Sequence, residues 1–128
     1  MTAAIPTFDA PGLAQVLDAS SQEQIDQLDF GVIGFDADAT VQRYNAFESQ
    51  AAGLSPQRVL GEPLFTNVAP CLNNFMVAQR FEDALADGAE LDETIDYVLT
   101  LRMRPIKVKL RLLAGANSGT RYVLVHRR

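Results

Sequence analysis

Alternating apolar and polar residues in the last third of the chain restrict its fold more than any other feature. The alternation runs through residues 91–103, and two further apolar segments follow at 106–113 and 121–126. A period of two places successive side chains on opposite faces of a β-strand. A proline and a loop rich in Gly, Asn and Ser separate the three segments. We therefore expect three consecutive antiparallel strands.

Two shorter segments earlier in the chain predict another pair of strands. Residues 30–35 and 40–44 flank an aspartate-containing turn, which is typical of a β-hairpin. The pattern then becomes helical over 46–52, where Gly53 can end the helix. A further short helical turn is expected after Ser55-Pro56. The hairpin therefore leads directly into short helices.

A proline-containing segment separates these helices from a longer one. Residues 62–72 include Pro63 and Pro70, which predict a rigid loop that presents Cys71 just before a helix. We expect that helix over about residues 75–87. Its buried face would consist of four residues at helical spacing, namely Phe75, Ala78, Phe81 and Leu85.

The order of these segments predicts an α+β fold. Residues 1–28 are expected to form an N-terminal helical cap, in which Ser20 and Glu23 have the spacing of a capping box. Residues 29–128 would form the core, because 128 residues suit one domain and are too few for two. We expect a five-stranded antiparallel sheet covered on one face by helices, with a ligand pocket between the two layers.

The charge of the chain disfavours nucleic acid as a partner. Sixteen acidic and 11 basic residues give a formal net charge of −5, and an acidic protein repels phosphate backbones. Lys107, Lys109 and Arg111 alternate with apolar residues, which indicates a solvated strand face. No apolar run approaches the roughly 20 residues of a membrane span, and the N-terminus has no features of a signal peptide. A cytoplasmic protein without a membrane partner is expected.

The sequence offers few residues for catalysis or metal binding. One cysteine and one histidine cannot form an internal disulfide or a zinc site of the usual ligands. There is no Gly-rich phosphate loop, nucleophile elbow or two-histidine metal motif. We therefore do not expect an enzyme. By residue type alone, Cys71 is a small buried apolar residue, Glu48 faces water, and Tyr44 packs at a strand end.

Several short motifs give those three residues another interpretation. They are Tyr44-Asn45-Ala46 with Glu48, Gly61, Val68-Ala69-Pro70-Cys71, Met103 before Pro105, and Lys107-Val108-Lys109. With these motifs the chain resembles, over nearly its whole length, the photoactive yellow protein (xanthopsin) family of small blue-light receptors. The resemblance implies a PAS domain.

The resemblance also implies a chromophore and its contacts. Cys71 would carry p-coumaric acid (4-hydroxycinnamic acid) as a thioester, Tyr44 and Glu48 would hold its phenolic oxygen, and Met103 would lie against it. The other expected pocket residues are Ala52, Leu54, Leu64, Pro70 and Leu99. Ala52 stands where the family usually has a hydroxyl, Leu54 where it often has an arginine, and Leu101 where a pocket tyrosine is frequent. Arg102 or Arg104 are candidates for the missing positive charge.

The implied photocycle assigns a proton to Glu48. An apolar pocket favours a neutral carboxyl, which can donate a hydrogen bond to a phenolate. After trans–cis photoisomerisation, proton transfer from Glu48 would leave a buried charge, and partial unfolding of the cap would signal to an unknown downstream protein. The chain would act as a monomer or weak dimer. The alternative is a PAS sensory or interaction module with no chromophore or with another small ligand.

Overall fold

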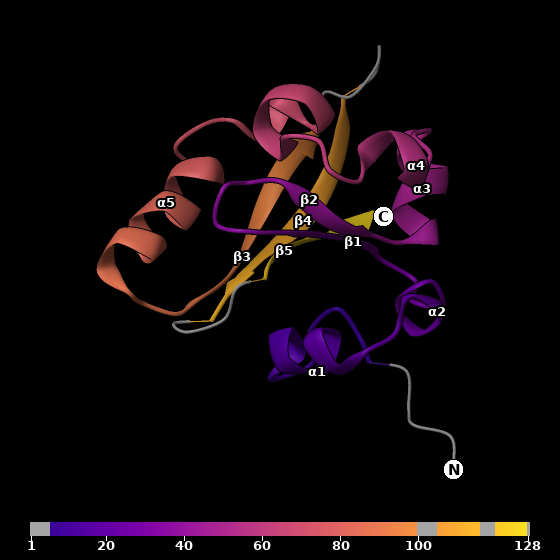
Figure 1. Cartoon of the computed structure of the whole chain (residues 1–128), viewed down its shortest axis with the longest axis horizontal. Coiled ribbons are helices and arrows are strands. Elements are labelled where there is room, and N and C mark those ends of the chain that lie inside the picture. The colour runs from indigo at the N-terminus through magenta and orange to yellow at the C-terminus, as the bar shows by residue number, and fades with distance from the viewer. Residues whose placement is uncertain (1–5, 100–104, 116–119, 128) are drawn as a thin grey trace.

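A five-stranded antiparallel sheet forms the centre of the computed structural model, which describes residues 6–99, 105–115 and 120–127 (Figure 1). The strands lie in the order β2-β1-β5-β4-β3, so the first and the last strand pair near the middle of the sheet. This confirms the predicted sheet. The strand bounds are Gly31–Phe35 (β1), Val41–Tyr44 (β2), Leu91–Leu99 (β3), Ile106–Ala114 (β4) and Arg121–Arg127 (β5).

Short helices precede and interrupt the strands. They are α1 (Leu13–Ala19), α2 (Gln22–Ile25), α3 (Ala46–Ala52), α4 (Pro56–Val59) and α5 (Ala78–Asp87), with a π-helical turn at Leu64–Val68 and a 3-10 turn at Pro70–Leu72. The predicted loop over 62–72 is therefore wrong. Pro63 directly precedes the π-helical turn and Pro70 begins the 3-10 turn. A proline is tolerated at these places because the first N–H groups of a helical turn need no partner within it.

The predicted buried face of the longer helix is partly wrong. Ala78 and Phe81 are buried as expected, but Phe75 is 80% exposed and Leu85 is 49% exposed. The Asn74 side chain accepts hydrogen bonds from the N–H groups of Met76 and Val77, which holds a turn ahead of α5. Phe75 belongs to that turn and not to the helix, and Ala84 completes the buried face in place of Leu85.

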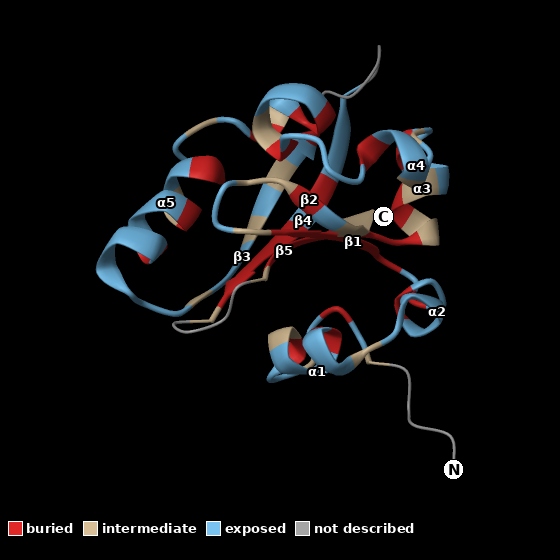
Figure 2. Ribbon diagram, viewed as in Figure 1, coloured by how far each residue is buried: buried red, intermediate tan, exposed pale blue. Residues whose placement is uncertain are grey.

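Two apolar clusters lie on opposite faces of the sheet, so helices cover both faces and not one (Figure 2). Along β5, Val123 and Val125 belong to the cluster under α3–α5, whereas Tyr122 and Leu124 belong to the cluster under the cap. This is the alternation that a strand imposes. The cap residues in the second cluster are Phe8, Leu13, Leu17, Ile25 and Leu28.

The cap is also joined to the sheet through polar and aromatic contacts. Arg111 donates hydrogen bonds to the carbonyls of Phe8 (2.9 Å) and Ala10 (2.7 Å) and pairs with Asp92. Arg111 is therefore buried, and its predicted place on a solvated face is wrong. The ring of Phe8 lies 5.1 Å from that of His126, centroid to centroid.

The capping box in the cap lies one residue later than predicted. Ser21 and Gln24 form it at the start of α2, with their side chains bonded to each other's backbone N–H. In the described part of the chain, no helix has the length and apolar character that crossing a membrane requires.

Candidate functional site

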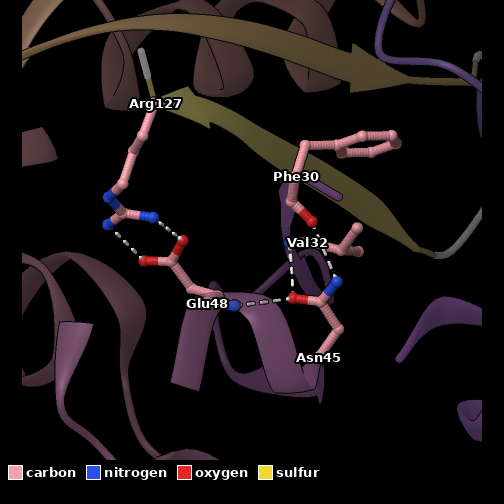
Figure 3. A network of polar contacts seen from close by, with 5 residues as sticks. All are labelled: Phe30, Val32, Asn45, Glu48 and Arg127. Carbon is pink, nitrogen blue, oxygen red and sulfur yellow. Dashed lines mark hydrogen bonds and ion pairs between the residues drawn. The ribbon is translucent and has the colours of Figure 1, made fainter. Parts of the chain in front are cut away.

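The first turn of α3 is fixed to β1 by one asparagine. Asn45 precedes the helix, and its side-chain oxygen accepts hydrogen bonds from the N–H of Glu48 (3.1 Å) and from the N–H of Val32 (2.9 Å). Its amide nitrogen donates to the carbonyls of Ile25 and Phe30. Figure 3 shows the contacts of Asn45 with Phe30, Val32 and Glu48. Because Asn45 is fully buried and bonded on both sides, α3 has a fixed position on the sheet.

Glu48 is buried between α3 and β1, with 2% of its surface exposed. Its carboxyl group lies directly over Gly31, where a Cβ atom would come within 2.0 Å of Oε1. The glycine therefore makes room for the carboxyl group, and the predicted solvent-facing alternative for Glu48 is wrong. Glu48 enters the interior because Asn45 places the helix start against the strand.

Arg127 at the end of β5 pairs with both oxygens of Glu48 (Figure 3). Arg127 Nη1 lies 2.6 Å from Oε1, and Nη2 lies 3.0 Å from Oε2. This bidentate geometry is typical of an arginine–carboxylate ion pair. The expectation of a neutral Glu48 concerns the protein with its chromophore bound, and it stays a prediction.

The phenol of Tyr44 lies in the same region as this ion pair. Tyr44 ends β2 and is 1% exposed. Burial, and then the negative charge of Glu48, raise the pKa of Tyr44 above its usual value, although Arg127 acts in the opposite direction. No hydrogen bond to the hydroxyl group is found among the described residues. Tyr44 is thus a protonated phenol with a hydrogen bond still to give.

Cys71 lies in the 3-10 turn, half-buried against the same apolar cluster that contains Tyr44. Its carbonyl oxygen accepts hydrogen bonds from the Tyr97 hydroxyl group and from Asn74 Nδ2 (3.2 Å). These contacts fix the backbone of the turn from its carbonyl side. The thiol is not part of a disulfide.

The structure gathers several of the other predicted pocket residues. Leu64 and Leu99 are buried in the cluster with Tyr44, Leu54 packs against it, and Ala52 is buried on α3. Pro70 is exposed and does not contribute a buried wall. Met103 and the alternatives Leu101, Arg102 and Arg104 lie outside the described residues.

A cavity of about 680 Å³ opens beside the turn that carries Cys71. Asn74 and Tyr97, which both bond the Cys71 carbonyl, belong to its wall. The rest of the wall consists of Met76, Asp96, Val98, Lys107 and Val108. Its size is ordinary for a small-molecule site. Neither Cys71 nor Tyr44 lines it.

Arg127 is the site residue that sequence reasoning missed. Its partner lies 79 residues away, so no local motif links them. One indication does exist in the sequence. Arg127 lies two and four residues after Val125 and Val123, so its side chain is on the same face of β5, the face that packs under α3–α5. Alternation alone therefore places Arg127 on the pocket side of the sheet. Within the described ranges, no cluster of three or more His, Cys, Asp or Glu residues could hold a metal ion.

Comparison with known proteins gives consistent matches over most of the chain. A family model described as PAS fold matches residues 25–128. The photoactive yellow protein of Rhodothalassium salexigens is 36% identical over 104 residues, which cover 81% of this chain and 82% of that protein. The photoactive yellow protein of Halochromatium salexigens is 32% identical over 120 residues, 94% of this chain and 95% of that protein.

A crystal structure is similar over nearly the same extent. It is the photoactive yellow protein domain of the sensor histidine kinase Ppr from Rhodospirillum centenum, at 32% sequence identity and a TM-score of 0.81. The match covers 88% of this chain and 98% of that domain.

Proposed function

Because the chain belongs to the photoactive yellow protein family of PAS-fold photoreceptors, we propose that it is a blue-light receptor that carries p-coumaric acid as a thioester on Cys71. The observation that supports this most is that a half-buried free cysteine, Cys71, and a buried phenol, Tyr44, lie at one apolar cluster, and that the Tyr44 hydroxyl group has no hydrogen-bond partner among the described residues. The thiol suits the acyl end of the group, and the phenol suits its hydroxyl end. When bound, the group supplies light absorption and trans–cis isomerisation.

The side chains around the two ends fit such a group. Tyr44 can donate its hydroxyl hydrogen to a phenolic oxygen, because it has no other acceptor among the described residues. Leu64 and Leu99 offer apolar walls. Tyr97 holds the carbonyl of Cys71 and so orients the turn. Attachment needs an activated acyl donor: the sulfur forms a bond to the acyl carbon, and the leaving group departs with the thiol proton.

The contacts of α3 give the chain a route from the site to the cap. Asn45 bonds the carbonyl of Ile25 at the end of the cap, and Asp26 accepts a hydrogen bond from the N–H of Ala46 (2.7 Å). Gln22 donates to the carbonyl of Tyr44 (3.0 Å). A change of charge at Glu48 therefore acts on residues that also hold α2. We propose that the cap loosens in the lit state and that a downstream protein in the cytoplasm reads the exposed surface.

A second candidate function is a PAS module that binds another small molecule and no chromophore. The cavity beside Asn74 and Tyr97 favours it, because that cavity is large enough for a ligand and is not lined by Cys71. Asp96 and Lys107 in its wall would select a polar ligand. Leu54 and Ala52, which differ from the usual residues of the family, are also consistent with this alternative.

Acylation of the full chain distinguishes the two candidates. We expect the purified apoprotein, offered an activated 4-hydroxycinnamoyl thioester, to gain the mass of one acyl group, and Cys71→Ser to gain none. Glu82→Gln is the control, since it changes an exposed residue of α5 and keeps the thiol. It should still gain the acyl mass. An unmodified wild-type chain, or an equal gain in Cys71→Ser, would contradict the proposal.

A further inference from the structure

The cavity beside Asn74 and Tyr97 has an exposed aromatic side chain at its edge. Phe75 lies between Asn74 and Met76, which both belong to the cavity wall, and 80% of its surface is exposed. We propose that this face of the protein pairs two copies of the chain, with Phe75 of each copy inserted into the cavity of the other. Such pairing needs no acyl group on Cys71, because Cys71 does not line the cavity.

Phe75 is held in a fixed turn, with its ring outside the protein core. The Asn74 side chain accepts hydrogen bonds from the N–H groups of Met76 (3.0 Å) and Val77 (3.2 Å). Its amide nitrogen donates to the carbonyl of Cys71 (3.2 Å). In the described part of the chain, Phe75 belongs to neither apolar cluster. An aromatic side chain on a rigid turn loses little conformational freedom on binding, so it is suited to anchor an interface.

Other exposed apolar side chains gather around the same cavity. Val98 belongs to its wall and is 46% exposed, and Ile106, which adjoins the wall residue Lys107, is 39% exposed. Single exposed apolar residues are ordinary, whereas a group of them beside a cavity marks an interaction site. The cavity, at about 680 Å³, has the size of a site for a whole small molecule, so a single phenyl ring fits inside it.

The charges of the wall favour a second copy over another kind of partner. Among the described residues of the wall, Asp96 is the acid and Lys107 is the base. Lys107 forms no ion pair in the described ranges, and Asp96 pairs there only with the exposed Lys109 (3.3 Å). Because the two charges balance, the wall has no excess charge that would attract a strongly acidic or basic partner. In a two-fold pair, each Lys107 instead meets Asp96 of the second copy.

The position of the cavity at the edge of the sheet leaves room for a second copy. β3, which supplies Asp96, Tyr97 and Val98 to the wall, is the last strand of the sheet. A ring beside a cavity on one surface can satisfy both copies about a two-fold axis, because each copy offers what the other receives. A contact made of one ring and one ion pair from each copy is small, so we expect a weak and reversible dimer.

The first test measures the mass of the full chain in solution. Sedimentation of wild type at concentrations up to about 1 mM should show a reversible equilibrium between monomer and dimer. Phe75→Ala should raise the dimer dissociation constant at least about tenfold. It should leave urea unfolding unchanged, because Phe75 packs in neither apolar cluster of the described residues. Wild type that stays monomeric would overturn the inference, and the cavity would then be left to a small molecule or another protein.

Leu60→Ala is the matched control for the loss of an exposed apolar side chain. Leu60 is 44% exposed and directly follows α4, which packs against β2 at the opposite edge of the sheet from β3. Its dimer dissociation constant should equal that of wild type. A Phe75→Ala variant that dimerises as strongly as Leu60→Ala would contradict the proposed pairing.

The second test exchanges the two charges of the wall. Lys107→Glu places acid opposite acid, and Asp96→Lys places base opposite base, so each variant alone should dimerise at least about tenfold more weakly than wild type. Loss of the exposed pair between Asp96 and Lys109 has little effect on the fold. In an equal mixture of the two variants, each acid meets a base, and native mass spectrometry should show mixed dimers in preference to either homodimer. A mixture without this preference would overturn the two-fold pairing.

Discussion

At the scale of single residues, Glu48 depends on Gly31, a residue without a side chain. The carboxyl group occupies the place where a β-carbon of residue 31 would lie. The backbone of Gly31 has an ordinary conformation, because its φ is not among the positive values. The need for glycine here is therefore one of space. Any larger residue must displace either the strand or the ion pair.

Gly31→Ala tests this requirement for space. A contact of 2.0 Å cannot persist, so we expect the free energy of unfolding to fall by about 1–3 kcal/mol, as in other overpacked interiors. Urea unfolding measures the change. In a Glu48→Ala background the same substitution should cost clearly less, because the clashing oxygen is gone. Equal costs in the two backgrounds would show that the strand, not the carboxyl group, excludes the side chain.

The sequence allowed some site residues to be predicted and not others. Tyr44, Glu48 and Cys71 carry motifs within a short stretch, and the structure buries the first two and places the third beside the same cluster. Arg127 has no such motif. Its role depends on a contact across the whole chain and on the direction of one long side chain, neither of which follows from composition or local spacing.

At the scale of elements, two arginines on the strands donate hydrogen bonds to backbone carbonyls of the cap. Arg43 donates to the carbonyls of Leu17 and Ser20 from β2, and Arg111 donates to those of Phe8 and Ala10 from β4. Helices as short as α1 and α2 have little stability of their own. Their position therefore depends on apolar contacts and on these two side chains.

Arg111→Met should loosen the cap selectively. Methionine keeps the apolar part of the side chain and removes every donor, so two carbonyls of the cap and Asp92 lose their partner. We expect amide hydrogen exchange to accelerate in residues 13–28 by about tenfold or more, the effect of losing roughly 1.5 kcal/mol of charged hydrogen bonds. Lys109→Met, which removes an exposed cation on the same strand, should not have this effect. A uniform acceleration along the chain would contradict a local role.

The bounds of a helix could be predicted from the sequence where one nearby residue type, such as a glycine at the helix end, determines them. The helix over 46–52 was predicted with its observed bounds from its apolar pattern and from Gly53, and the structure adds Asn45 as the residue that caps its start. The region from 62 to 77 was less predictable. Its prolines and asparagines are compatible with both loops and tight helical turns, and contacts with the rest of the protein select the turns.

At the scale of the whole molecule, each face of the sheet buries one large tyrosine. Tyr44 lies in the cluster under α3–α5, and Tyr122 lies in the cluster under the cap. Burial and the hydrogen bond to Asp18 raise the pKa of Tyr122 to about 12, although Arg43 lowers it. Burial raises the pKa of Tyr44 as well. The folded protein therefore keeps both phenols protonated at pH values where the unfolded chain loses them.

Stability should accordingly decline in alkali. Above about pH 10 the unfolded chain releases the phenolic protons that the folded chain retains, so the unfolded state binds fewer protons and gains stability as the pH rises. The loss should approach about 1.4 kcal/mol per pH unit for each tyrosine. Urea unfolding between about pH 8 and pH 11 measures it. Tyr122→Phe should show a clearly smaller slope above about pH 10. An identical slope in wild type and variant would contradict this assignment.

The sheet could be predicted from the sequence as a whole, but the placement of helices on both of its faces could not. Alternation, short apolar segments and the turns between them identified all five strands. The antiparallel pairing of β1 with β2 and of β3 with β4 follows from the short connections. The helical cap over residues 1–28 was also predicted. The side of the sheet on which the cap packs cannot be predicted from the cap sequence alone, because it depends on Val32, Leu113 and Leu124 on that face of the sheet.

The end of β5 has two neighbouring residues that serve opposite sides of the protein. Arg127 forms an ion pair with Glu48 on the side of α3. His126, one position earlier, packs against the ring of Phe8 in the cap. The two sides are therefore separated by a single peptide unit. If the ion pair between Arg127 and Glu48 broke and the backbone of residues 126–127 rotated, the contact between His126 and Phe8 would change directly. No side chain of either apolar cluster would have to move first.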